Sequence, residues 1–162
     1  MFLVQDSSES REARIKSFLA EDPPLSALLA VIHFEWTVRR AIIALGTSPN
    51  VVVRAKLKNC HGLDRYKDVW KDEVSLGDVQ KSLPEVVKNW EGLRRAFRLR
   101  HRLVHGATSC GTEYASERVN WAIEATNSIR AVCDAHGINL DSRPPIRRQP
   151  SSKTSVTISL ES

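Results

Sequence analysis

The sequence has few of the residues that build disulfide frameworks, membrane spans or nucleotide-binding loops. Its 162 residues include three cysteines, an odd number at wide spacing that argues against a disulfide framework and fits a reducing cytoplasm. No apolar run approaches the length of a transmembrane helix, and the N-terminus lacks the basic region of a signal peptide. A P-loop and a GxGxxG motif are also missing. These absences predict a soluble, cytoplasmic protein with no membrane partner.

The few Cys and His residues that lie close in sequence do not form a convincing metal site. Cys133-x-x-His136 and the adjacent pair Cys60-His61 are the nearest approach to one, and neither has the paired C-x-x-C knuckle of a zinc site. We therefore expect incidental thiols, no bound metal and no cofactor. The formal charge of +5 suits an anionic partner, although arginines and lysines on a solvated helix face are the commoner cause of a mild excess.

Apolar residues recur at three- and four-residue intervals along most of the chain, which predicts an all-α bundle of about four to six helices. Capping residues, prolines and glycines divide it into helices over residues 7–19, 25–45, from 51, 63–74, from 82 to the glycine at 106, and 112–136. Residues 1–24 form a polar helix and a proline linker, residues 25–137 the helical domain, and residues 138–162 a disordered basic tail.

The segment 25–45 is apolar on nearly every face, which predicts a central helix or one partly covered by a second subunit. Its polar residues include Glu35 and Arg39, whose i,i+4 spacing favours a helical ion pair. Glu35 is also a candidate for supporting a nearby functional site.

The most basic stretch is 94–106, which holds five arginines and two histidines near the end of a predicted helix. Val86, Trp90, Leu93 and Phe97 recur as one buried stripe, and the helix should begin at the capping box around Ser82. Gly106 can adopt the left-handed conformation that ends a helix. A helix end favours cations, but five arginines exceed what that effect requires.

Within this stretch, Arg100-His101-x-x-x-His105 resembles the RX4–6H motif of the HEPN superfamily, small all-α domains that include many metal-independent endoribonucleases. The resemblance covers about residues 25–136. It implies that His105 transfers a proton and Arg100 binds the phosphate, with His101 at the polar position between them. It also implies a homodimer, and a role as a toxin with a partner antitoxin or as a phage-defence effector. In the antitoxin-paired branch a tyrosine follows the motif histidine by two positions. Ala107 stands there in this chain, so regulation through that tyrosine is excluded.

The residues themselves suit RNA cleavage, because RNA carries its own nucleophile in the 2′-hydroxyl. A histidine can exchange protons near neutral pH, and an arginine fork can bind two phosphate oxygens. Neighbouring arginines would follow adjacent phosphates without reading sequence; these are Arg94, Arg95, Arg98 and Arg102. Two alternatives remain: a non-catalytic module that binds RNA or a partner protein, and a helical scaffold whose arginines only face solvent.

Helix geometry adds a prediction about assembly. Arg100 and His105 are five positions apart, which places them roughly 140° apart around an ideal helix. A two-fold axis beside this helix would bring Arg100 of one chain near His105 of the other, so we expect a homodimer with the motif at its interface.

Overall fold

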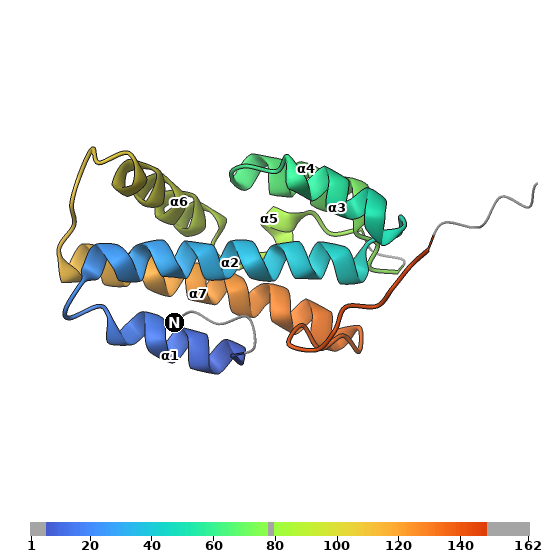
Figure 1. Cartoon of the computed structure of the whole chain (residues 1–162), viewed down its shortest axis with the longest axis horizontal. Helices are drawn as coiled ribbons and strands as arrows, with labels where there is room; N and C mark the ends of the chain where they lie inside the picture. Colours follow the sequence, from blue (N-terminus) through green and yellow to red (C-terminus); the bar gives the residue numbers. More distant parts are fainter. Residues whose placement is uncertain (1–5, 78–79, 149–162) are drawn as a thin grey trace, which may run out of the picture.

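The computed structural model describes residues 6–77 and 80–148, and within these ranges the chain is helical, with no strand beyond an isolated bridge between Gly46 and Val74. The elements are α1 (Ser8–Ser17), α2 (Pro23–Leu45), α3 (Asn50–Lys58), α4 (Leu63–Glu73), α5 (Leu83–Val86), α6 (Trp90–Val104) and α7 (Thr112–Ala135) (Figure 1). The predicted all-α class is confirmed. None of the helices in the described part of the chain is both long and apolar enough to cross a membrane.

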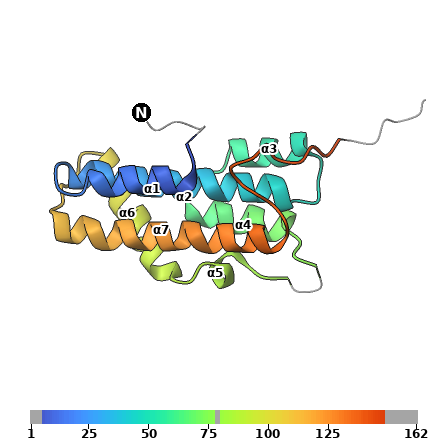
Figure 2. The ribbon, with the colours of Figure 1, turned by 90° about the horizontal axis from the view of Figure 1, so that it is seen from below.

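The two longest helices, α2 and α7, run side by side along the length of the molecule, as the two perpendicular views show (Figures 1 and 2). α1 and α6 pack against this pair near one end, while α3, α4 and α5 gather near the other. The prediction that α2 is central is confirmed, since Phe34, Val38 and Ile42 are completely buried. Ile32 is the exposed large apolar side chain of α2, so the monomer itself covers most of this helix.

Several helix limits follow the local signals closely. α2 begins at Pro23, two residues before the predicted start, because proline fits the first turn of a helix. The Asp22 carboxylate caps that turn by accepting a hydrogen bond from the backbone N–H of Leu25 at 3.1 Å. The ambiguous run at 51–53 lies in α3, which confirms the helical interpretation.

The prediction of one continuous helix from residue 82 to Gly106 is wrong, because the structure divides this range into α5 and α6. The capping box exists: Glu85 accepts from the backbone N–H of Ser82 at 2.7 Å. The backbone becomes extended at Val87, and Asn89 then caps α6 by accepting from the N–H of Gly92 at 2.9 Å. The described residues therefore form seven helices instead of the four to six predicted.

Gly92 allows the first turn of α6 to approach α7 closely. A Cβ added there would lie 2.7 Å from the Trp121 ring and 2.6 Å from the Asn89 side chain. This contact fixes where α6 starts, and with it the direction of the basic stretch that follows.

The predicted disordered tail is wrong for residues 138–148, which pack against the bundle. Leu140 is buried, and Asp141 forms ion pairs with Arg11 at 3.1 Å and Arg130 at 2.7 Å. The Arg147 guanidinium donates to the carbonyls of Ile43 and Ala44 at the C-terminal end of α2. Figure 2 shows this segment crossing the end of the bundle beside α3. Residues 149–162, the remainder of the predicted tail, lie outside the described residues.

Candidate functional site

The end of α6 has the backbone arrangement that positions the motif histidines. Gly106 has a φ of 66°, the left-handed conformation predicted for it. Its N–H donates to the carbonyl of Leu103 at 3.1 Å, and the N–H of Ala107 donates to the carbonyl of Arg102 at 2.9 Å. These two bonds form a Schellman motif, which ends the helix and leaves His105 as its C-cap residue.

The two histidines of the motif lie against each other at this helix end. The ring centroids of His101 and His105 are 4.3 Å apart, and the rings are tilted by 57°. Both residues are exposed, so a ligand can reach both imidazoles from solvent. The spacing of four residues places the rings on one face, which brings two proton-transfer groups within reach of one phosphate.

Arg100 faces the other predicted partner of the site, Glu35 on α2. An Arg100 guanidinium nitrogen lies 3.7 Å from a Glu35 carboxylate oxygen, with side chains 37% and 17% exposed. The predicted Glu35–Arg39 ion pair is wrong, because Arg39 donates instead to the Tyr66 hydroxyl at 2.7 Å and to the carbonyls of Leu57 and Cys60. The Glu35 carboxylate is therefore available to hold Arg100.

The basic stretch forms one wall of an open groove of about 790 Å³, which we call the arginine groove. Its charged and aromatic lining comes from α6, α7 and the start of α4: Asp64, Arg94, Arg95, Phe97, Arg98, Arg100, His101, Arg102, Tyr114 and Arg118. Six of these are arginines and one is an acid. His105 lies outside the lining, although its ring contacts that of His101.

Part of this positive charge is balanced within α6. Glu91 lies 2.8 Å from Arg98, 3.7 Å from Arg95 and 3.9 Å from Arg94, and all four side chains are about half exposed or more. Exposed ion pairs of this kind contribute only about 0–1 kcal/mol to stability. A polyanion can therefore displace them at little cost.

The opposite wall of the arginine groove comes from α7 and was not identified from the sequence. Arg118 lies over the Tyr114 ring, with its guanidinium carbon 3.2 Å from the ring centroid and 5.4 Å from that of Trp121. Arg102 of α6 donates to the Tyr114 hydroxyl at 3.2 Å. The spacing of Tyr114, Arg118 and Trp121 at i, i+4 and i+7 was the available signal, since it places them on one helix face.

Residues suited to metal binding are dispersed in the structure. Within 6–77 and 80–148, no three His, Cys, Asp or Glu side chains gather in a group that could hold a metal ion. The three cysteines are free thiols, and burial raises the pKa of Cys133 to about 12. His136 points back to the carbonyl of Val132 at 2.8 Å. The charged and titratable groups at the candidate site are imidazole, guanidinium and carboxylate side chains.

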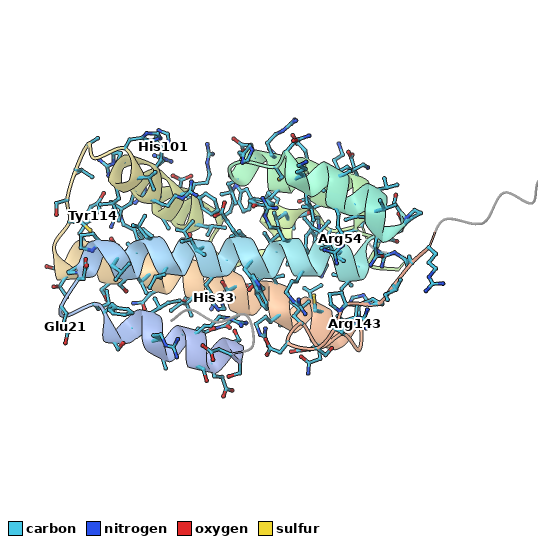
Figure 3. All side chains as sticks on the ribbon, in the orientation of Figure 1. Glu21, His33, Arg54, His101, Tyr114 and Arg143 are labelled. Atoms are coloured by element: carbon cyan, nitrogen blue, oxygen red, sulfur yellow. The ribbon has the colours of Figure 1, made fainter. Side chains whose placement is uncertain are left out.

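Figure 3 shows His101 and Tyr114 at the same end of the bundle, with Arg54 near the opposite end. The structure thus brings the predicted residues Arg100, His101 and His105 to one end of α6, with Glu35 beside Arg100 and the other arginines along the groove. Comparison of the chain with models of protein families, with curated proteins and with solved structures found no match. The function of this site is therefore inferred from its residues and their geometry.

Proposed function

We propose that the protein is a HEPN-like, metal-independent endoribonuclease whose site is formed by Arg100, His101 and His105. The observation that carries the proposal is the pair of exposed imidazoles, 4.3 Å apart at the end of α6, beside a groove lined by six arginines. The groove supplies affinity for a polyanion, and the imidazoles supply proton transfer next to it.

The reaction uses the 2′-hydroxyl of RNA as the nucleophile. One imidazole removes the 2′-hydroxyl proton as O2′ attacks the adjacent phosphorus, and the other donates a proton to the departing 5′-oxygen. The products are a 2′,3′-cyclic phosphate and a 5′-hydroxyl. The Arg100 guanidinium stabilises the charge on the phosphorane oxygens, and such electrostatic stabilisation is usually the largest catalytic effect.

Glu35 acts in this scheme as a positioning residue. Its carboxylate is mostly buried and forms an ion pair with Arg100 at 3.7 Å, so it attracts the guanidinium to one side of α6. A guanidinium fixed in advance binds a phosphate with less loss of side-chain freedom than a fully mobile one.

The position of His105 supports the homodimer expected from helix geometry. Arg100 lines the arginine groove, whereas His105 lies outside it at the helix end, next to the exposed apolar side chain of Val104. In a two-fold dimer formed around this end of α6, Arg100 of one subunit and His105 of the other would flank the same phosphate. α2 offers little surface for this interface, because other helices of the same chain already cover most of it.

The test is RNA cleavage in EDTA by the wild-type protein and by Arg100→Ala and Arg100→Lys. Alanine should abolish cleavage, and lysine should restore little, because an ammonium cannot form the two parallel bonds of a guanidinium. Melting temperatures should stay close to that of the wild type, since the Arg100–Glu35 pair is partly exposed. Arg54→Gln, an exposed arginine change on α3, is the control. Full activity in Arg100→Ala would refute the assignment. RNA binding without cleavage by the wild type would identify the alternative, a binding module.

A further inference from the structure

The α7 wall of the arginine groove contains a buried cation and an exposed aromatic ring side by side. We propose that Tyr114 and Arg118 of this wall, together with Arg102 of α6, form a subsite for single-stranded RNA. It stacks one base on Tyr114 and binds the phosphate of that nucleotide through the two arginines. This inference rests on the proposed function and specifies the substrate class that the site accepts.

Arg118 is the first element of the subsite. The residue is only 8% exposed, yet its side chain lines the groove. One terminal nitrogen donates to the Tyr114 carbonyl at 3.0 Å and to the Glu117 carboxylate at 2.9 Å, while Nε has no hydrogen-bond partner in the described structure. The Nε atom is itself buried, so an anion in the groove would interact with the positive charge of the Arg118 guanidinium, which lines the groove, and not with that atom.

Tyr114 is the second element. The Arg118 guanidinium covers one face of its ring, with its carbon 3.2 Å from the centroid, and 43% of the residue remains exposed. The hydroxyl accepts a hydrogen bond from Arg102, which holds the ring against the groove. A ring fixed on one face and open to solvent is a platform for a nucleobase, and the cation beneath it strengthens the stacking.

The charges on the two sides of Tyr114 determine where the phosphate and the base of a bound nucleotide lie. Tyr114 stands between the arginine groove and a second hollow of about 870 Å³, which is also lined by Glu113 and Glu117. The Glu113 carboxylate repels a phosphate, as does Glu117 to the extent that Arg118 leaves its charge uncompensated, whereas the arginines of the groove attract it. A bound nucleotide therefore places its phosphate in the groove and its base on the Tyr114 side.

This arrangement selects single strands. Bases in a duplex stack on one another and pair, so they cannot present a face to Tyr114 without unstacking. The arginines of α6 contact phosphates of either form, which means that discrimination depends on the aromatic ring. We therefore expect Tyr114 to contribute to single-strand affinity and hardly at all to duplex affinity.

The experiment measures RNA binding in a cleavage-inactive His105→Ala background in EDTA. Fluorescence anisotropy follows a short labelled single-stranded RNA, a duplex of the same sequence and a labelled polyglutamate peptide. Tyr114→Ala should weaken single-strand binding about tenfold, the loss expected for one base–aromatic stack, and leave duplex binding nearly unchanged. Arg102→Gln should lower the slope of log affinity against log salt by about 0.7, the value for one single-strand phosphate contact.

Arg54→Gln is the matched control for the charge change, because Arg54 is exposed on α3 near the other end of the bundle (Figure 3). The inference would be overturned if Tyr114→Ala bound the single strand as tightly as its parent, or if it lost as much affinity for the duplex as for the single strand. Preferential binding of polyglutamate would also overturn it. The measurements distinguish a failure of the Tyr114 subsite from a failure of the proposed cleavage activity. A protein that never cuts RNA but loses single-strand affinity with Tyr114→Ala retains the subsite and loses the proposed activity. One that cuts RNA but is indifferent to Tyr114→Ala retains the activity alone.

Discussion

Asp141→Ala tests whether the segment after α7 is part of the folded structure. The Asp141 carboxylate joins Arg11 of α1 at 3.1 Å to Arg130 of α7 at 2.7 Å. The Arg11 side chain is 2% exposed, and the alanine variant removes the carboxylate paired with it, leaving His33, the backbone carbonyl of Asp6 and the Trp36 ring as contacts. Removing one partner of a buried ion pair costs about 3–5 kcal/mol. We expect the lower figure, about 3 kcal/mol, because Asp141 is 28% exposed.

A loss of about 3 kcal/mol lowers the melting temperature of a protein this size by roughly 6–12 °C, which circular dichroism measures directly. Asp134→Ala is the control, since Asp134 is an exposed aspartate on α7. Burial alone would raise the pKa of Asp141, but hydrogen bonds from Arg130 and Arg11 lower it on balance. The stabilisation is therefore present above the unfolded pKa and is lost as pH falls through the folded one. A melting temperature unchanged at neutral pH would show that the segment does not pack as described.

Three further predictions concern the site and the core. Glu35→Gln should slow RNA cleavage roughly ten- to hundredfold by releasing Arg100, with little change in melting temperature. An unchanged single-turnover rate would contradict the positioning role of Glu35. Mixing Arg100→Ala with His105→Ala protein should restore about a quarter of wild-type activity if each site is shared between two subunits, and no recovery after verified subunit exchange would exclude that arrangement. Burial would raise the pKa of Glu73, but hydrogen bonding, mainly from Lys56 at 2.5 Å, lowers this pKa on balance. The stability that the Glu73 carboxylate contributes is therefore lost as pH falls through the lowered pKa. The free energy of unfolding of Glu73→Gln, measured in urea at a series of pH values, should accordingly fall less steeply toward acid pH than that of the wild type. The same pH dependence in both proteins would contradict this.

The sequence was sufficient to predict most helices because each carries a strong local signal. α2 and α7 have long apolar patterns, the capping box around Ser82 marks a helix start, and Gly106 marks a helix end. The division between α5 and α6 was missed because Asn89 is one polar residue among many in the sequence, and the close approach of Gly92 to Trp121 on α7 appears only in the fold. That contact depends on tertiary structure, which periodicity does not report.

The ordered part of the C-terminal segment was missed for a related reason. Besides Leu140 and the Asp141 ion pairs, residues 138–148 are held by hydrogen bonds from arginine side chains to backbone carbonyls, as Arg147 and Arg40 show. Such bonds leave no hydrophobic pattern in the sequence. Arg39 shows the same effect, because carbonyls at the end of α3 and the Tyr66 hydroxyl bind it in place of Glu35.

The candidate site likewise contains some residues whose placement follows from the sequence and others that only the fold brings together. Arg100, His101 and His105 lie close in sequence, so their placement at one helix end follows from local geometry. The Arg100–Glu35 contact and the α7 wall with Tyr114 and Arg118 come from other helices, and only the fold brings them together.

The most direct test of the proposed activity compares wild-type and His105→Ala protein on one RNA in EDTA and identifies the chemical ends of the products. We predict that the wild type yields 2′,3′-cyclic phosphate and 5′-hydroxyl ends, and that His105→Ala cuts about 10²–10⁴-fold more slowly while remaining helical. Cleavage that requires Mg²⁺, or that proceeds at the wild-type rate in His105→Ala, would contradict the metal-independent mechanism at this site.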